Sequence, residues 1–231
     1  MTVTLITGAN KGLGRETARR LVEAGHLVYV GARDPQRGSA AARDVGARFV
    51  ALDVLDDESV SAAAAAIERE HGALDVLVNN AGIAGGSVPA AETTAEQVQR
   101  VYETNVFGVV RVTRAFLPLL LRSPTPVIVN VSSGMGSLTV TTDPNRFEST
   151  LTGLAYPSSK AALNMLTSQY AKNFPQVRIN AVDPGYTATD LNGHRGTQPV
   201  EEGAEIIVSM ATVGPDGPSG GFFDRNGRVP W

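Results

Sequence analysis

The chain has 231 residues, no cysteine and a formal charge of −3 at pH 7. This length suits one α/β domain. The absence of cysteine excludes disulfides and thiolate catalysis and favours a reducing cytoplasm. No basic stripe is present, so binding to nucleic acid or to a membrane surface has no electrostatic support. The first ten residues lack the features of a signal peptide, and the longest apolar runs are too short to span a bilayer.

Short apolar segments alternate with helical patterns along the chain. Strands are predicted at residues 3–7, 27–32, 48–52, 75–79, 126–132, 177–182 and 220–223. Helices are predicted at residues 12–24, 35–45, 56–71, 94–122, 155–174 and 199–211, and Thr94 with Gln97 forms a capping pattern at the start of the longest. This alternation predicts a single α/β domain over residues 1–231, with a doubly wound parallel sheet, the Rossmann fold.

A glycine-rich turn follows the first predicted strand. It reads Gly8-Ala-Asn10-Lys11-Gly12-Leu13-Gly14 and leads into the first predicted helix. Glycines permit a tight turn and let backbone N–H groups approach a pyrophosphate, and the helix N-terminus adds partial positive charge. A glycine triplet would also fit an ordinary strand–helix turn, but its place between strand and helix favours dinucleotide binding.

The end of the second predicted strand bears on the choice between NAD(H) and NADP(H). An acidic residue that binds the ribose diol usually stands there, whereas this strand ends in Ala32-Arg33. A 2′-phosphate needs cations and no opposing carboxylate, and Arg33 and Lys11 would supply them. NADP(H) is therefore the expected cofactor. Two alternatives stay open: both cations could be solvated only, and Asp34 could pair with Arg33.

Further motifs at predicted strand ends and helix starts occur in an order that resembles the short-chain dehydrogenase/reductase family. They are Asp53-Val54, Asn79-Asn80-Ala81-Gly82, Asn105 within Thr-Asn-Val-Phe-Gly, Ser132-Ser133, Tyr156-Pro-Ser-Ser-Lys160 and Asn180-Ala-Val-Asp-Pro184-Gly185-Tyr-Thr187-Ala-Thr189. The match extends along nearly the whole chain. It implies an oxidoreductase that transfers a hydride between a nicotinamide cofactor and a carbonyl or secondary alcohol.

The glycine turn and the resemblance together give the expected cofactor contacts. These are Gly8, Asn10, Lys11, Gly12, Leu13, Gly14, Arg33, Asp53, Val54, Asn80, Ala81, Gly82, Tyr156, Lys160, Pro184, Gly185, Thr187 and Thr189. Pro184-Gly185 is expected to turn the chain under the nicotinamide. Thr187, by its backbone, and Thr189, by its hydroxyl, are expected to contact the carboxamide and a phosphate, although both could simply cap a turn.

Tyr156 and Lys160 suit the proton transfer that carbonyl reduction requires. A free tyrosine has a pKa near ~10, so a nearby cation is expected to lower it. Lys160 stands one helical turn from Tyr156 and shares its helix face. By resemblance, Ser133 hydrogen-bonds the substrate oxygen and Asn105 anchors a water that extends the proton relay from Lys160. Taken alone, Tyr156 and Lys160 could be an exposed pair on an amphipathic helix.

Within the family, the chain resembles the carbonyl reductase branch most closely. The shared features are Asn10-Lys11 ahead of Gly12, the run Gly31-Ala32-Arg33-Asp34, the segment 199–205 and a tail ending at Trp231. That branch often carries a long insertion between the serine and the tyrosine, whereas the interval here is 23 residues. A homo-oligomer, dimer or tetramer, is expected from the shorter insertion.

Two irregular segments, 134–153 and 187–198, are expected to form the substrate cleft. The second is short and polar, and the first offers Met135, Leu138, Phe147, Leu151 and Leu154, with Tyr186 nearby. An open cleft of this kind predicts a small-molecule carbonyl or alcohol substrate of variable size. The competing hypotheses are a dinucleotide-binding sensor on the same fold and an epimerase or dehydratase. No residues are spaced as metal ligands, so no metal is expected.

Overall fold

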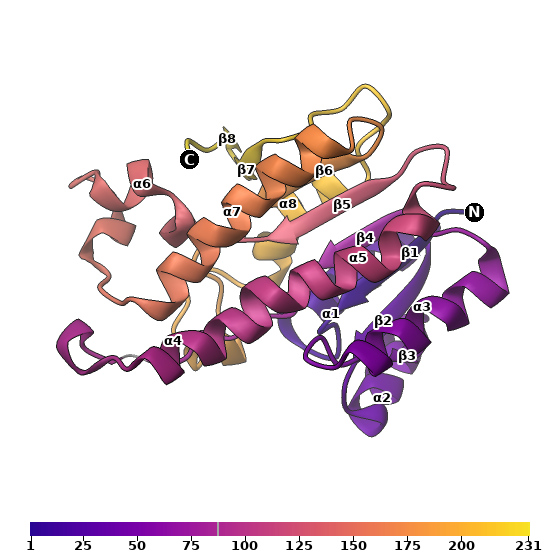
Figure 1. Cartoon of the computed structure of the whole chain (residues 1–231), viewed down its shortest axis with the longest axis horizontal. Coiled ribbons are helices and arrows are strands. Elements are labelled where there is room, and N and C mark those ends of the chain that lie inside the picture. Colours follow the sequence, from indigo (N-terminus) through magenta and orange to yellow (C-terminus); the bar gives the residue numbers. More distant parts are fainter. Residues whose placement is uncertain (87) are drawn as a thin grey trace.

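The computed structural model describes residues 1–86 and 88–231 and is built around one eight-stranded sheet (Figure 1). The strand order is β3-β2-β1-β4-β5-β6-β7-β8, and neighbours are parallel except for β7 and β8. The strands are β1 (Val3–Thr7), β2 (Leu27–Ala32), β3 (Arg48–Ala51), β4 (Val76–Asn79), β5 (Val127–Val131), β6 (Arg178–Val182), β7 (Phe222–Asp224) and β8 (Gly227–Arg228). The doubly wound sheet is confirmed, and the antiparallel β8 is an addition to it.

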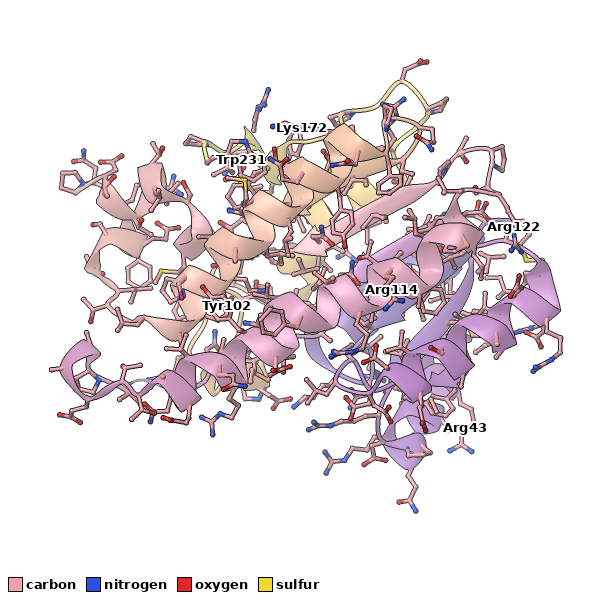
Figure 2. All side chains as sticks on the ribbon, viewed as in Figure 1. Arg43, Tyr102, Arg114, Arg122, Lys172 and Trp231 are labelled. Carbon is pink, nitrogen blue, oxygen red and sulfur yellow. The ribbon has the colours of Figure 1, made fainter. Side chains whose placement is uncertain are left out.

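The helices cover both faces of this sheet (Figure 1). One face carries α3 (Asp57–His71), α4 (Ala95–Tyr102), α5 (Gly108–Leu120) and α7 (Ala155–Asn173). The other carries α1 (Gly12–Glu23), α2 (Pro35–Val45) and α8 (Val200–Ala211). Figure 2 shows Tyr102 and Arg114 on the helical rod of α4 and α5, and Lys172 on α7 beside it. Within the described residues, no helix combines the length and the apolar character needed to cross a membrane.

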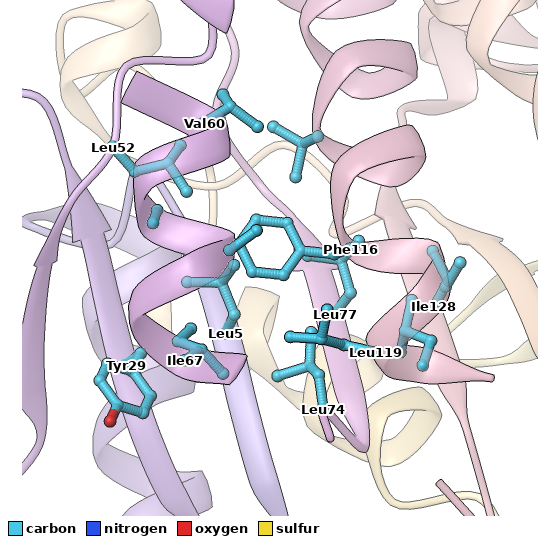
Figure 3. Packing of buried hydrophobic residues seen from close by; sticks show 14 of the residues in the cluster. Leu5, Tyr29, Leu52, Val60, Ile67, Leu74, Leu77, Phe116, Leu119 and Ile128 are labelled. Atoms are coloured by element: carbon cyan, nitrogen blue, oxygen red, sulfur yellow. The ribbon is translucent and has the colours of Figure 1, made fainter. Parts of the chain in front are cut away.

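Burial on both sheet faces explains the apolar strands. All five residues of β1 and of β5 are buried, as expected for central parallel strands between two helical layers. Figure 3 shows Phe116 of α5 packed among Leu5, Ile67 and Leu77, which come from β1, α3 and β4. This packing fixes the strand ends at which the motifs lie.

The predicted helix over residues 94–122 is wrong in one respect. It begins with the expected capping box of Thr94 and Gln97, but five residues form a π-helical turn, η2 (Glu103–Phe107), between α4 and α5. A π turn accommodates an extra residue inside a helix and frequently occurs at functional sites. Here it contains Asn105, so the side chain of Asn105 is set by a local distortion that hydrophobic periodicity does not reveal.

The irregular segments contain short helices. These are η3 (Gly134–Gly136), α6 (Leu138–Thr142) and η4 (Phe147–Thr150) after β5, η5 (Asp190–Asn192) after β6, and η1 (Ala90–Glu92) before α4. The C-terminal tail packs onto the segment after β5. The backbone N–H and the hydroxyl of Thr139 donate to the Trp231 carbonyl at 3.3 and 2.8 Å, and the indole of Trp231 stacks on Phe222.

Candidate active site

A large cleft lies at the carboxyl ends of the strands, where the order of the sheet reverses between β1 and β4. Its volume is about 700 Å³. In doubly wound sheets this reversal sends neighbouring crossovers to opposite faces and opens a crevice. The lining includes nearly every residue that the sequence singles out: Gly8, Asn10, Lys11, Gly12, Leu13, Gly14, Arg33, Asp53, Val54, Asn80, Ala81, Gly82, Ser133, Tyr156, Lys160, Pro184, Gly185, Thr187 and Thr189. Asn105 is buried and lies outside the lining.

The glycine turn is held against the end of β4. The Asn80 amide donates to the carbonyls of Thr7 and Gly8 at 2.8 and 3.2 Å, and the Thr7 hydroxyl accepts the backbone N–H groups of Asn80 and Ala81. A Cβ on Gly14 would stand 2.5 Å from the Asn80 amide nitrogen. Only glycine at position 14 therefore permits the Asn80 side chain to lie this close. The turn is held from the side of β4 and stays open toward the cleft.

The end of β2 presents a cation and no carboxylate to the cleft. Arg33 is exposed and lines it beside the buried Ala32. Asp34 caps α2 instead, because its carboxylate accepts the N–H groups of Gln36 and Arg37 at 3.0 and 3.1 Å. Asp34 therefore does not form the ion pair with Arg33 that the sequence left open.

Lys11, the second expected cation, is already paired. Its ammonium lies 2.9 Å from the Asp190 carboxylate, and both side chains are about half exposed. The hydrogen bond from Lys11 is the main reason that the pKa of Asp190 is lowered. Arg33 is thus the cation more readily available to an anionic group at this end of the cleft.

Tyr156 and Lys160 stand on the first turns of α7; Lys160 is buried, and Tyr156 is partly buried where it lines the cleft. The Lys160 ammonium lies 5.6 Å from the centre of the Tyr156 ring and donates to the Val131 carbonyl at 2.8 Å. The Ser133 hydroxyl hydrogen-bonds to the phenol and accepts the Met135 N–H at 3.2 Å. Two segments far apart in sequence thus place three polar groups together.

Burial governs the protonation of this pair. It raises the pKa of Tyr156 to about 12, although the hydrogen bond from Ser133 opposes the shift. It also lowers the pKa of Lys160 to about 8. The net shift of the phenol pKa is upward, because removing the phenolate from water has the larger effect. That Lys160 favours the phenolate stays a prediction. The phenol is held in its protonated form.

The side chain of Asn105 is fully engaged. Its amide donates to the Ile83 carbonyl and to the Ser159 hydroxyl, and its oxygen accepts the Ile83 N–H, at 2.9 to 3.0 Å. These bonds connect the π turn to the chain after β4 and to α7. A role in anchoring a relay water remains a prediction.

Asp183 is a buried carboxylate of the cleft that sequence reasoning missed. Its carboxylate accepts the Gly185 N–H at 3.0 Å, and burial raises its pKa. Its charge also raises the pKa of Lys160 and of Tyr156. The acidic residue before Pro184-Gly185 was the available signal, but sequence alone does not show that its side chain points inward.

The apolar wall of the cleft is partly the expected one. Met135, Phe147, Leu151 and Tyr186 line it, and the rings of Phe147 and Tyr186 lie 5.6 Å apart. The assignment of Leu138 and Leu154 to this wall is wrong. Short helix α6 buries Val140, and a residue two positions away faces the opposite side, so Leu138 is 75% exposed. Further lining residues come from the loop after β4 and from η5: Ile83, Ala84 and Leu191.

Comparison with known proteins agrees with this geometry. The family model described as short chain dehydrogenase matches residues 2–199. Short-chain dehydrogenase anuI of Penicillium roqueforti is 39% identical, with 92% of this chain and 89% of the relative covered. Carbonyl reductase (NADPH) 1 of Pongo abelii is 34% identical, with 100% of this chain and 99% of the relative covered.

A solved structure extends the likeness to three dimensions. The NADPH-bound carbonyl reductase from chicken fatty liver has a TM-score of 0.87 and 29% identity, with all of both chains covered. The alignment with the Pongo abelii protein runs over 279 positions against 231 residues here, so that relative carries residues this chain lacks. The sequence resemblance to this family is confirmed.

The first prediction concerns the Lys160 ammonium. It should titrate near pH 8, below the ~10.4 of a free lysine, because burial disfavours the charged form. Titration of the lysine ¹³Cε resonances measures this, with the exposed Lys172 as the control. Asp183→Asn should lower the midpoint further, since it removes a charge that favours the ammonium. A Lys160 midpoint at or above that of Lys172 would contradict the assignment.

Proposed function

The chain belongs to the short-chain dehydrogenase family, and on this premise we propose that it is an NADPH-dependent carbonyl reductase. The observation that carries the proposal is the meeting of Tyr156, Lys160 and Ser133 beside the glycine turn. Hydride transfer to a carbonyl needs an acid for the developing alkoxide and a donor that polarises the carbonyl. The sensor hypothesis loses support, because the acid and the polarising donor are both present and the relatives are named dehydrogenases and reductases.

Tyr156, Ser133 and Lys160 have separate roles in this proposal. NADPH, when bound, supplies the hydride. The Tyr156 phenol donates its proton to the carbonyl oxygen, and its raised pKa keeps it protonated at physiological pH. The Ser133 hydroxyl donates a hydrogen bond to the same oxygen. The Lys160 ammonium favours the phenolate that remains, which needs a cation because it is buried.

The choice of NADPH rests on the end of β2. Ala32 leaves no carboxylate to repel a 2′-phosphate, and Arg33 lines the cleft without an ion pair to any of residues 1–86 or 88–231. A guanidinium matches a phosphate in geometry as well as in charge. Two of the similar proteins carry NADPH in their names.

The chain after β6 forms the part of the cleft in which we propose that the nicotinamide binds. Gly185 has a φ of +73° and turns the chain beneath the cleft. The Thr187 hydroxyl donates to the Pro184 carbonyl at 3.1 Å and accepts from Gln198. Its backbone N–H donates to the Gly185 carbonyl and its carbonyl accepts from Asn192, so a carboxamide that binds the Thr187 backbone would replace one of these partners. The Cβ and methyl group of Thr189 lie against Gly12, so Thr189 stands beside the glycine turn, where we propose that its hydroxyl contacts a phosphate.

The substrate we propose is an apolar carbonyl compound of variable size. The aromatic pair Phe147 and Tyr186 and the side chains of Met135 and Leu151 form the wall. Phe147 is 54% exposed and Leu151 41%, which indicates a cleft open at that edge. An open apolar wall discriminates size poorly.

Assembly and location complete the proposal. A homo-oligomer would form through α4–α5 and α7, which lie side by side and expose Phe107 and Met165 (Figure 1). The cytoplasm is the proposed compartment, because the chain has no cysteine to form disulfides.

Arg33→Ala should weaken NADPH binding by ~1.5–3 kcal/mol, or roughly 10- to 150-fold, because one charge-assisted hydrogen bond is lost. NADH, which has no 2′-phosphate, should bind as before. Isothermal titration with both cofactors measures this. Arg37→Ala is the matched control, since Arg37 is a nearby exposed arginine outside the cleft. Tighter binding of NADH than of NADPH by the unmodified chain would refute the cofactor proposal.

Tyr156→Phe should still bind NADPH and lose at least about 1,000-fold in kcat, because the acid is absent while the other cofactor contacts remain. Single-turnover oxidation of NADPH by a ketone, followed at the absorbance of the reduced nicotinamide, measures the chemical step. Tyr170→Phe on the same helix removes a hydroxyl remote from the cleft and serves as the control. Near-normal turnover in Tyr156→Phe would assign the proton to another group.

Small and bulky ketones, aldehydes and quinones should differ in kcat/KM by less than about 10⁴-fold, because each methylene in an apolar pocket is worth only ~1–3 kcal/mol. Phe147→Ala should reduce kcat/KM for aromatic carbonyls more than for small aliphatic ones. Steady-state kinetics over a graded series provides the measurement. A preference beyond about 10⁴ for one compound would indicate buried polar recognition and end the open-cleft proposal.

A further inference from the structure

The turn that carries Ser133 rests directly on the helix that carries Tyr156. The turn, Ser132–Gly136, follows β5 and includes η3. Asn164, one helical turn beyond Lys160, bonds to both of its ends. The Ser132 hydroxyl donates to the Asn164 amide oxygen at 2.6 Å, and the Asn164 amide nitrogen donates to the Gly136 carbonyl at 3.1 Å. One side chain thus holds the residue before Ser133 and the residue three positions after it.

Both bonds are shielded from water. Asn164 is 4% exposed and Ser132 is 3% exposed. A buried amide that loses its partner keeps the cost of desolvation, so these bonds favour one arrangement of the turn over others. The contact is close as well as polar, because a Cβ on Gly136 would stand 2.6 Å from the backbone carbon of Lys160.

Lys160, a residue that the reaction uses, also joins α7 to this region: its carbonyl accepts a longer bond of 3.5 Å from the Ser132 hydroxyl, and its ammonium bonds to the end of β5. The Lys160 ammonium donates to the Val131 carbonyl at 2.8 Å, but the proposed mechanism also requires this ammonium beside Tyr156. The backbone bond from Gly136 to Ser133 shapes the turn without connecting it to α7. Asn164 connects the two elements and lies outside the lining of the cleft.

We propose that Asn164 is a positioning residue for the reaction, which fixes the Ser133 hydroxyl relative to the Tyr156 phenol by bonding to both ends of the turn. The inference rests on the proposed roles of Ser133 and Tyr156. If the turn moves on α7, the two donors no longer converge on one carbonyl oxygen. A misplacement of about 1 Å at a reacting group costs up to ~100-fold in rate. Cofactor contacts on the glycine turn and on Arg33 are unaffected.

The test compares Asn164→Ala with Thr167→Val. Thr167 is equally buried, one turn further along α7, and accepts a hydrogen bond from Asn130 at 2.9 Å. Both variants remove a buried polar partner from the same helix, but only Asn164 bonds to the turn. Asn164→Ala should lower kcat by about 10- to 100-fold with the NADPH Kd within twofold, and should enlarge the primary isotope effect from deuterated NADPH. Thr167→Val should keep kcat within threefold of the unmodified chain.

Two further variants keep the test decisive if Asn164→Ala does not fold. Ser132→Ala removes the bond to Asn164 from the opposite side, together with the longer one of 3.5 Å to the Lys160 carbonyl. Asn164→Asp keeps an acceptor for Ser132 but loses the donor to Gly136. Each should lower kcat by at least fivefold with unchanged NADPH affinity. If the folded variants at positions 132 and 164 all match Thr167→Val in kcat, the inference is overturned.

Ser133→Ala separates this result from a failure of the proposed function. If Ser133→Ala loses activity while the Asn164 variants do not, only the positioning role is wrong. If Ser133→Ala retains full activity, the proposed role of Ser133 fails, and the positioning role fails with it.

Discussion

The site depends on the contact between the ends of β1 and β4, where the order of the sheet reverses. Thr7 accepts two backbone N–H groups from the chain after β4, and Asn80 donates to two carbonyls of the glycine turn. Because neighbouring crossovers depart to opposite faces at this point, the crevice between them needs polar bonds across its floor. Those bonds hold the glycine turn open, and every other cleft residue takes its place relative to that turn.

Buried polar groups then extend from the floor of the cleft into the helical layer. Asn79 donates to Asn130, Asn130 donates to Thr167, and Asn164 joins α7 to the serine turn. Such networks specify one arrangement of the elements, since any shift leaves a desolvated donor or acceptor without a partner. The same burial sets the chemistry, because it keeps the Tyr156 phenol protonated and makes the Lys160 ammonium easier to deprotonate.

Sequence patterns predict the parts of this molecule that depend on local rules. The strands, the capping box at Thr94 and the glycine turn follow from periodicity and backbone geometry, and the structure contains them. The π turn around Asn105 cannot be predicted from periodicity, because five residues are too few to show a period of their own within a helix that continues on both sides. The orientation of Asp183, the outward side chain of Leu138 and the pairing of Lys11 depend on tertiary packing, which no local pattern contains.

The ion pair between Lys11 and Asp190 joins the glycine turn to the segment after β6, on either side of the same cleft. Both side chains are about half exposed, so salt screens the attraction between them. The link between the glycine turn and the segment after β6 therefore weakens as ionic strength rises, whereas the partly buried bonds between the glycine turn and the end of β4 do not depend on salt in this way.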